Sequence, residues 1–418
     1  EINGVTYSAP SKDIQGVQRP SPLGSTPDMG AFESDKGVDP TYSGPVWYVD
    51  DVGLPYANGG PGAPFGHFYQ AIGSASDGDT IYVYESVITE NVDFGGKNLV
   101  IIGENKETSI IDGNQTGNTI KAINGENAVL KNLTITNGNS SWGGGVLVDN
   151  TTTLLIEDCI IMANNVGNTG GGVAAEDNSV VKISNTVVSN NTSQKGAGLS
   201  SYGGSSIIID RSIIINNSAT IAAGAFYCYE GSTISVSQSS VTDNSLPEIA
   251  FAEEASLSNQ FSMEYSNFAG VADSVLQFEN DVVIWGLGNI NVDPKFIDYD
   301  NNNYHLFANS KLINAGNPDS LDSDGTRADI GAFPYLNSYS GPNWYISESG
   351  NDLNAIGSSE NPFRSIQSAI NFSENSDSLL VASGSYFENI DFKGKALLLH
   401  GENRENTFID GGSNGIVM

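Results

Sequence analysis

The chain has 418 residues and a formal net charge of −32. Such an excess of carboxylates opposes binding to nucleic acid or anionic membranes, because both carry charge of the same sign. The two cysteines, Cys159 and Cys228, are too few for a disulfide scaffold, and two buried unpaired thiols are favoured over a bridge. No apolar run approaches the roughly 18 residues of a membrane span, so membrane insertion of this segment is not expected.

The chain repeats itself once at long range. Asn91-Val92-Asp93-Phe94-Gly95-Gly96-Lys97 returns as Asn389-Ile390-Asp391-Phe392-Lys393-Gly394-Lys395, an offset of 389 − 91 = 298 residues. We therefore interpret the chain as a window from a longer tandem protein. The predicted parts are the closing segment of a preceding module at 1–34, a linker at 35–45, a complete module at 46–334, a second linker at 335–342, and the opening part of a following module at 343–418.

Each opening segment contains a stretch with the spacing of a short amphipathic helix, at 68–75 and again at 365–372. A solenoid end exposes apolar core and unpaired strand edges, and a helix laid across it would cover both. We expect the closing segment to cover the other end with loops.

Between about 129 and 245 the chain has a second, finer repeat. Four segments align without gaps, and each ends on asparagine: 156–164, 183–191, 209–217 and 236–244. A period of 26–27 residues, with short β-branched runs and turns of Gly, Asn and Ser, is typical of a β-solenoid. Leucine-rich and helical repeats are disfavoured, because the chain has no regular Leu-x-x-Leu-x-Leu pattern and its runs are short. The predicted fold is all-β: a right-handed parallel β-helix with a short N-terminal capping helix, in tandem modules.

One position of each coil is predicted to form a structural column of stacked asparagines. Neighbouring coils pair in parallel about 4.8 Å apart, so identical side chains stack. A buried amide can then bond the backbone of the next coil at a sharp turn. We favour this structural role over a ligand-binding row. The predicted members are Asn137, Asn164, Asn191, Asn217 and Asn244.

The whole module resembles secreted bacterial proteins of the pectin-lyase-like, right-handed β-helix superfamily. Trp344-Tyr345-Ile346 and Tyr386-Phe387-Glu388-Asn389 look like their opening segment, which is also similar to that of pectin methylesterases. The paired apolar-x-x-Asn and Gly-Gly-x-apolar markers resemble the repeats of chlamydial polymorphic membrane proteins, a surface adhesin family. Asp293-Pro294-Lys295-Phe296 and Asp329-Ile330-Gly331-Ala332-Phe333 are similar to the closing segment of large bacterial surface β-helix proteins. The resemblance implies the fold but not one activity, because the superfamily includes lyases, esterases, adhesins and phage spikes.

Enzymes of this superfamily work from carboxylates and a basic residue on one exposed sheet. Asp158 and Arg211 share a predicted column two coils apart, about 10 Å at the rung spacing. Asp149 and Glu176 share a predicted turn column, where a close acidic pair can raise one pKa or hold a cation. Solvated turn residues are the favoured interpretation, and no catalytic residue is assigned. The candidates in the repeats are Glu157, Asp158, Glu176, Asp177, Asp210 and Arg211.

The loop from Asp319 to Asp329 contains an Asp-x-Asp-Gly spacing, which presents alternating carboxylates around a tight turn as calcium loops do. It lacks the remaining ligands of an EF-hand. The predicted metal ligands are Asp322, Asp324 and Asp329, and calcium would then raise the melting temperature. A structural latch, in which Arg327 pairs with an acid of the cap, is favoured over the metal site. No cofactor is expected to be required, and Ca²⁺ is the one candidate.

We predict a non-catalytic extracellular building block: a stalk, fibre, filament or adhesive segment of a giant tandem-repeat bacterial surface protein. The expected partners are neighbouring modules of the same chain or identical chains, together with a polysaccharide or a host or cell surface. Nucleic acid is not an expected partner. The alternative is a polysaccharide-binding or polysaccharide-degrading, lyase-like protein. Its sugar-stacking aromatics would be Trp142, Tyr202, Tyr227 and Tyr229.

Overall fold

The computed structural model describes residues 12, 42–52, 57–253, 256–268 and 274–412. Apart from residue 12, the predicted closing segment at 1–34 lies outside the described residues, as does most of the predicted linker at 35–45. The chain divides into two compact units, one formed by 1–182 with 190–206 and the other by 183–189 with 207–418. None of the helices in the described part of the chain is both long and apolar enough to cross a membrane.

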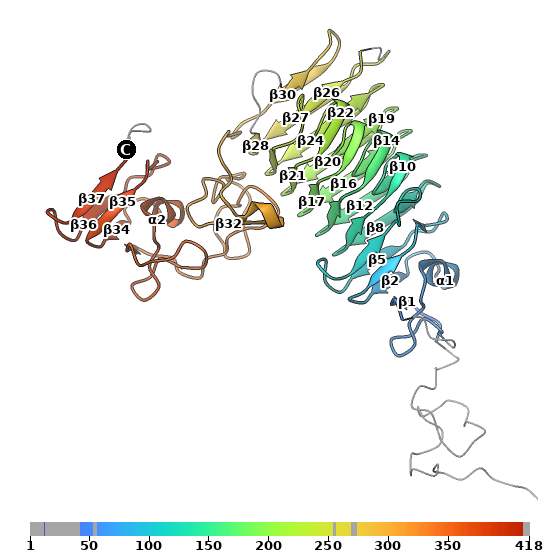
Figure 1. Ribbon diagram of the computed structural model, residues 1–418, viewed down its shortest axis with the longest axis horizontal. Coiled ribbons are helices and arrows are strands. Elements are labelled where there is room, and N and C mark those ends of the chain that lie inside the picture. The colour runs from blue at the N-terminus through green and yellow to red at the C-terminus, as the bar shows by residue number, and fades with distance from the viewer. Residues whose placement is uncertain (1–11, 13–41, 53–56, 254–255, 269–273, 413–418) are drawn as a thin grey trace, which may run out of the picture. The chain divides into compact units, whose positions relative to one another are not determined.

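The first unit is a stack of parallel coils, whose strands run side by side from blue to green in Figure 1. Its sheets have the orders β1-β2-β5-β8-β12, β4-β7-β11-β15-β19, β3-β6-β9-β13 and β10-β14-β18. The bounds are β1 (Val46–Val49), β2 (Thr80–Val83), β3 (Val87–Thr89), β4 (Val92–Asp93), β5 (Val100–Gly103), β6 (Ile110–Asp112), β7 (Ile120–Ala122), β8 (Asn127–Lys131), β9 (Thr134–Thr136), β10 (Asn139–Trp142), β11 (Val146–Val148), β12 (Thr153–Glu157), β13 (Ile160–Met162), β14 (Asn165–Thr169), β15 (Val173–Ala175), β18 (Thr192–Lys195) and β19 (Leu199–Tyr202). Strands β16 (Val180–Ser184) and β20 (Ser206–Asp210) contribute residues to both units.

Alternation of buried and exposed residues along each strand builds a column of side chains in the core. Trp47 pairs with Ile81, Ile81 with Ile101, Ile101 with Leu130, and Leu130 with Ile156. All five side chains are buried. Burying a large aliphatic side chain contributes about 1.5–3 kcal/mol, so these columns account for much of the stability of the coils.

The second unit combines further parallel coils with two other parts. These are the closing segment, from Asp293 to Phe333, and the second opening segment, described over 343–412. Its parallel sheets have the orders β24-β27-β30, β23-β26-β29, β17-β21-β25-β28, β33-β34-β36 and β35-β37, whereas β31 and β32 are antiparallel. The bounds are β17 (Val187–Ser189), β21 (Ile213–Ile215), β22 (Ser218–Ala222), β23 (Phe226–Tyr229), β24 (Thr233–Ser237), β25 (Ser240–Thr242), β26 (Ile249–Phe251), β27 (Gln260–Glu264), β28 (Asn267–Phe268), β29 (Val275–Leu276), β30 (Val282–Trp285), β31 (Phe296–Asp298), β32 (Asn303–Leu306), β33 (Asn343–Ile346), β34 (Ser378–Val381), β35 (Gly384–Phe387), β36 (Leu398–Gly401) and β37 (Thr407–Asp410), with a 3₁₀ turn, η1, at Tyr299–Asn301.

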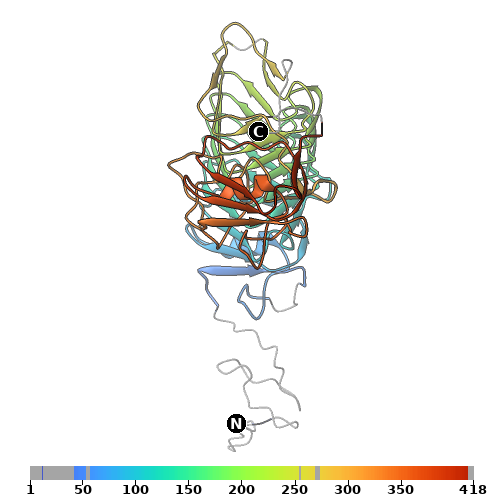
Figure 2. The same cartoon turned by 90° about the vertical axis from the view of Figure 1, so that its left-hand side faces the viewer.

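Two short helices lie where the sequence predicts them. Helix α1 (Phe68–Ser74) contacts β1, and α2 (Ile366–Phe372) contacts β33 and β34. Figures 1 and 2 show α2 beside the red strands of the second opening segment. The Ser365 hydroxyl caps α2 by accepting the Ser368 N–H. The prediction of an all-β parallel solenoid with a short capping helix is therefore confirmed.

Both cysteines are buried, and neither forms a disulfide among the described residues. Burial raises the pKa of the Cys159 thiol to about 12 and also raises the pKa of Cys228. Thiols held in this state are poor nucleophiles, so they act as core residues.

Candidate functional site

Asparagine side chains link successive coils of the first unit. Asn164 is buried, and its Oδ1 accepts the Gly138 N–H at 2.9 Å while its Nδ2 donates to the Ile135 carbonyl at 3.2 Å. The Asn164 backbone N–H and Nδ2 both donate to Asn191 Oδ1 at 3.0 Å. Asn191 in turn donates to the Ile161 carbonyl at 3.0 Å. These buried amides satisfy turn groups that the strands leave open, so they act structurally.

The same bonding recurs in the second unit. Asn217 donates its backbone N–H and its Nδ2 to Asn244 Oδ1, at 3.0 and 2.9 Å. Asn244 Nδ2 donates to the Ile214 carbonyl at 3.0 Å and to Glu248 Oε2 at 3.3 Å. The carboxyl group of Glu248 thus gives Asn244 a side-chain oxygen acceptor, as Asn244 does for Asn217. Burial raises the pKa of Glu248 to about 7.

Asn137 does not belong to this column, which corrects the prediction. Thr136 pairs with Met162, so Asn137 lies level with Ala163, and Gly138 takes the column position opposite Asn164. Asn137 and Ala163 both have left-handed backbone, at φ 58° and 55°. The Asn137 side chain binds Asp112 Oδ2 at 2.9 Å. The prediction used a step of 27 residues here, whereas the coil step is 164 − 138 = 26.

Glu176 is the most perturbed carboxylate in the coils of the first unit. Burial raises its pKa to about 7, and the nearby charges of Asp149 and Asp177 raise it further. Its Oε1 is buried and has no hydrogen-bond partner within the described part of the chain. The predicted turn pair of Asp149 and Glu176 thus interacts electrostatically. The described residues nevertheless contain no group of three or more His, Cys, Asp or Glu arranged to hold a metal ion.

The other charged candidates of the repeats bind close neighbours. Glu157 pairs with Lys131 at 3.0 Å, and Asp158 lies 3.9 Å from the same ammonium. Arg211 pairs with Asp210 at 3.1 Å. Asp158 and Arg211 both occupy left-handed turn positions, at φ 53° and 43°. These contacts fit solvated turn residues, and the predicted spacing of Asp158 from Arg211 stays a prediction.

The Asp-x-Asp-Gly loop uses its carboxylates to bind its own backbone. Asp329 is buried, and it accepts the N–H groups of Asn314 and Tyr335, both at 2.7 Å. Asp322 Oδ2 accepts the Asp329 N–H at 2.9 Å. Asp324 accepts the Thr326 N–H at 2.9 Å and the Asn337 N–H at 2.8 Å. The carboxylate oxygens thus accept backbone N–H groups that organise the loop, an arrangement that does not favour a calcium cage.

Arg327 does act as a latch, although its partners differ from the predicted acid. Its Nε donates to the Gly316 carbonyl at 2.8 Å, and a terminal nitrogen donates to the Ala315 carbonyl at 3.4 Å. A guanidinium has five donors in a fixed fork, so it can hold two successive carbonyl groups. Arg327 therefore holds the loop through backbone oxygens.

Each cap helix is held at both ends by side chains that follow it in the chain. The Glu90 carboxylate accepts the Phe68 and Tyr69 N–H groups of α1, at 2.8 and 3.0 Å. Lys97 Nζ donates to the Ile72 carbonyl in the last turn and to the Ala75 carbonyl just after it, at 2.5 and 2.7 Å. An anion at the N-terminus and a cation at the C-terminus both complement the helix dipole and satisfy its open backbone groups.

The second cap repeats this arrangement. Glu388 accepts the first two N–H groups of α2, at 2.7 and 3.0 Å, and Lys395 Nζ donates to the Ile370 and Asn371 carbonyls at 2.7 and 3.0 Å. Asp79 and Asp377 likewise each accept a tryptophan indole N–H, at 2.9 and 2.8 Å. The internal repeat therefore preserves a complete set of cap contacts.

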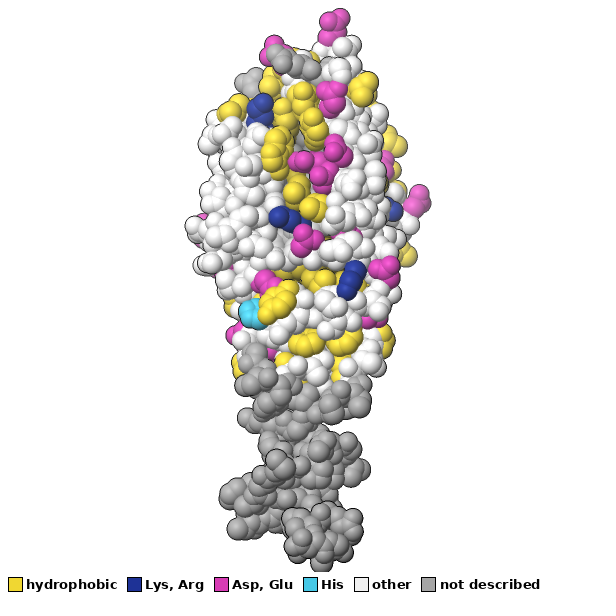
Figure 3. Space-filling view, turned by 90° about the vertical axis from the view of Figure 1, so that its right-hand side faces the viewer, with side chains coloured by type: hydrophobic (Ala, Val, Ile, Leu, Met, Phe, Trp, Pro, Cys, Tyr) yellow, Lys and Arg dark blue, Asp and Glu magenta, His cyan; other side chains and the backbone are white. Residues whose placement is uncertain are grey.

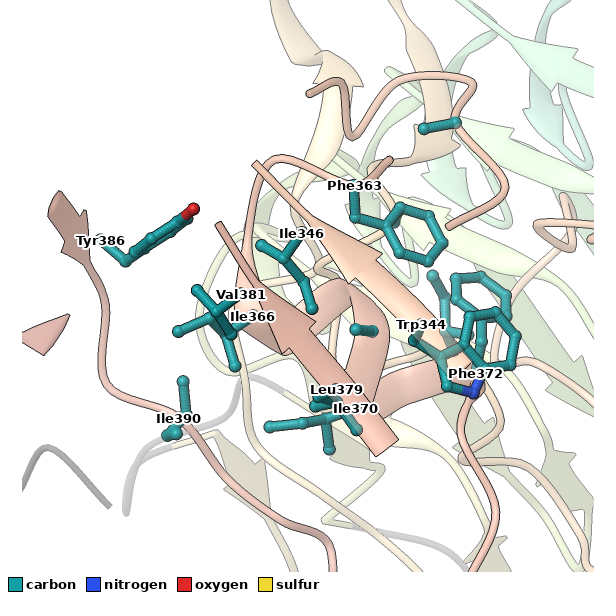
Figure 4. Close-up of a cluster of buried hydrophobic side chains, with 14 of the residues drawn as sticks. Trp344, Ile346, Phe363, Ile366, Ile370, Phe372, Leu379, Val381, Tyr386 and Ile390 are labelled. Atoms are coloured by element: carbon teal, nitrogen blue, oxygen red, sulfur yellow. The ribbon is translucent and has the colours of Figure 1, made fainter. Parts of the chain in front are cut away.

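One buried cluster joins the closing segment to the second opening segment. Figure 4 shows its aromatic centre, where the rings of Trp344, Phe363 and Phe372 lie against one another. The ring centroid of Phe372 is 5.4 Å from that of Phe363, 6.2 Å from that of Trp344 and 5.3 Å from that of Tyr335. The buried members from the closing segment are Leu306, Ala308, Leu312, Ile313 and Ile330.

Residues 71–261 match the family described as the right handed beta helix region. These residues thus form a right-handed parallel β-helix. The β-helix is similar to pectate lyase Pel9A at 14% identity, covering 69% of this chain and 96% of that one, with a TM-score of 0.39. It is also similar to pectin methylesterase from carrot at 11% identity, covering 60% and 85%, with a TM-score of 0.35. At these values the likeness says nothing about activity, and no curated protein matches the chain.

The aromatic side chains of the β-helix repeats have mixed surroundings. Trp142 is 39% exposed and lies 6.4 Å from Tyr202, ring centroid to ring centroid. Tyr227 is buried among alanines, with Tyr229 packed against the same cluster. On the face shown in Figure 3, hydrophobic side chains gather in a narrow strip with carboxylates beside it. Trp142 is thus available to a ligand, whereas Tyr227 is a core residue.

The side chains that hold the cap helices were missed by the sequence analysis. Glu90, Lys97 and their copies lie in the repeated blocks, but repetition alone does not say what they touch. The sequence signal that could have found them is that the glutamate and the lysine are identical in the two copies, whereas several neighbouring residues differ. Lys393, which replaces Gly95, is a difference between the copies that also went unnoticed.

Proposed function

We propose that this β-helix is a non-catalytic extracellular building block, forming a stalk, fibre, filament or adhesive segment of a large tandem-repeat bacterial surface protein. The observation that carries the proposal is the single buried cluster shared by the closing segment and the following opening segment. A chain of independent enzymes needs only linkers between modules, whereas a load-bearing array needs packed junctions. The packed junction supports the second case.

The interior of the coils also supports a structural role. Buried amide side chains of the repeats, such as Asn164 and Asn217, bond the backbone of adjacent coils. The charged candidates Glu157 and Arg211 are used in local ion pairs. Polar groups committed in this way stabilise a regular rod. The proposed partners are therefore neighbouring modules of the same or identical chains, outside the cell or on its surface.

Electron micrographs of the full-length parent protein test this proposal. Tandem rods whose length grows with the number of modules are expected. Isolated globular particles, without rods, would contradict it.

A polysaccharide-active protein is the second candidate, and Glu176 is the observation in its favour. A carboxyl with a pKa raised to about 7 beside Asp149 has the character of a general acid. The test is incubation of the full chain with acidic and neutral polysaccharides, with and without calcium. Release of unsaturated or reducing-end products that is lost in Glu176→Gln would establish the enzyme and overturn the structural proposal.

A further inference from the structure

The loop from Leu306 to Ala315 in the closing segment, called here the closing loop, presents backbone carbonyl groups to α2. Asn371 is fully buried, and its Nδ2 donates to the carbonyls of Ala308 and Ser310 at 2.8 and 2.7 Å. Its Oδ1 accepts Gln367 Nε2 at 3.2 Å, which fixes the orientation of the amide. One side chain of the helix thus holds two carbonyl groups of the closing loop.

A second donor comes from the turn that follows β35. Lys393 Nζ donates to the Ile313 carbonyl at 2.7 Å and to the Lys311 carbonyl at 3.3 Å. Burial lowers the pKa of this ammonium to about 8. Burying a cation costs free energy unless its N–H groups are hydrogen-bonded. The Ile313 and Lys311 carbonyls offset this cost for Lys393.

The closing loop also donates to the opening segment. Asn314 Nδ2 donates to the Asn371 carbonyl at 2.9 Å, and the Ala308 N–H donates to the Asp352 carbonyl at 2.8 Å. The contact therefore has donors and acceptors on both sides, and Ala308, Leu312 and Ile313 of the closing loop belong to the same apolar cluster as Phe372. Such a two-sided pattern fixes one register of loop against helix, because a shifted loop would leave buried groups unpaired.

The first cap lacks the two donors. At the internal offset of 298 residues, Gly73 stands for Asn371 and Gly95 stands for Lys393. All seven residues of α2 are buried, whereas in α1 only Phe68, Ala71 and Ile72 are, and Tyr69 is 64% exposed. The helix clasp is kept in both caps, whereas the two side chains that donate to the closing loop in the second cap are replaced by glycine in the first.

We propose that the closing loop is a docking surface that selects the opening segment following it, and that Asn371 and Lys393 are the residues it recognises. Its partner is an opening segment that carries an amide on the last turn of the cap helix and an ammonium on the turn after β35. A segment with glycine at both positions, such as the first one, is not accepted. The inference rests on the proposed tandem function, since it gives the order in which modules can follow one another.

Amide hydrogen exchange on the full chain tests the docking surface. In Asn371→Gly/Lys393→Gly, the amides of the closing loop and α2 are expected to exchange roughly tenfold faster or more, because several buried hydrogen bonds are lost. The coils from 129 to 245 should be unchanged and serve as the internal reference. Protection of the closing loop equal to that of the natural chain would overturn the proposal.

Two further variants separate recognition from general packing. Asn371→Leu/Lys393→Met keeps the bulk of both side chains but removes their donors, so the Ala308 amide should lose protection as it does in the double glycine variant. Protection equal to that of the natural chain would assign selection to packing and overturn the proposal. Lys393→Met keeps a long side chain without donors, and it tests the same point if the double variant fails to fold.

A control for the substitutions themselves places the two donors on the first cap. A Cβ on Gly73 meets no atom within 4 Å, and Gly95 has φ of +61°, close to the φ of 52° that Lys393 adopts. Gly73→Asn/Gly95→Lys should therefore fold and leave the closing-loop exchange unchanged. All these exchange measurements are made on the single chain in solution. Results contrary to those expected would therefore refute selection by the closing loop, but they would not bear on whether the parent protein forms rods.

Discussion

Glu90 and Lys97 bind opposite ends of the same short helix. The carboxylate of Glu90 accepts the N–H groups of Phe68 and Tyr69, and the ammonium of Lys97 reaches the Ile72 and Ala75 carbonyls. A helix of seven residues is too short to be stable by itself. The following coil therefore stabilises the cap that covers it, and cap and coil are expected to unfold together.

Lys97→Met tests the clasp. The substitution keeps the aliphatic stem but leaves the carbonyls at the end of α1 without their cation. We expect the free energy of unfolding to fall by about 1.5–3 kcal/mol, the usual range for hydrogen bonds to charged groups. Denaturant titration followed by circular dichroism measures it. Lys182→Met, at an exposed lysine, should change stability little, and equal losses in both variants would argue against the clasp.

Asn164→Ala tests the asparagine column against a neighbour in sequence. It removes the acceptor of the buried Gly138 N–H and the donor to Ile135, at an expected cost of about 2–3 kcal/mol. Asn165 is exposed, and Asn165→Ala should cost under about 0.5 kcal/mol. Thermal melts of the two variants decide the point. Similar melting temperatures would show that the column is dispensable.

We expect the buried carboxyl group of Glu248 to make the free energy of unfolding depend on pH. Its pKa is raised from 4.5 to about 7, chiefly by burial, so the folded state binds the proton more tightly than the unfolded state. The stabilisation is therefore complete below about pH 4.5 and is lost as the pH rises to about 7, by at most about 3 kcal/mol. Glu248→Gln stays neutral and should be less sensitive over this window than the natural chain.

Unfolding midpoints at pH 5 and pH 7.5 check this expectation. Burial raises the pKa of Glu176 and Asp329 as well, so the effect of Glu248 is the difference between variant and natural chain. Glu107→Gln, at an exposed position, is the matched control. An identical pH dependence in Glu248→Gln and the natural chain would contradict the assignment.

Calcium gives a fourth prediction. Because Asp324 and Asp329 already accept backbone N–H groups, we expect the same melting temperature in calcium and in chelator. Differential scanning calorimetry is the measurement. A rise with calcium that disappears in Asp324→Asn would instead restore the cation site predicted from the sequence.

The coil period could be predicted from the sequence because it repeats a local pattern of apolar residues. Val188, Ile214 and Val241 align in the sequence and pair in that register. The placement of Asn137 was wrong because one coil step is a residue shorter, and a one-residue shift moves a side chain to another column. The aspartate loop was ambiguous because the same spacing suits a cation and a self-bonded turn.

Leu312 and Ile370 lie in one buried cluster, although the internal repeat assigns them to successive copies. The boundary of the sequence repeat therefore does not coincide with a boundary of packing, because one buried cluster spans the end of one copy and the start of the next. A fragment cut at the apparent boundary near 335–342 would separate Tyr335 from Phe372 and expose apolar surface on both sides. Fragments that keep both parts of this cluster should therefore be better behaved than fragments cut at the boundary of the repeat.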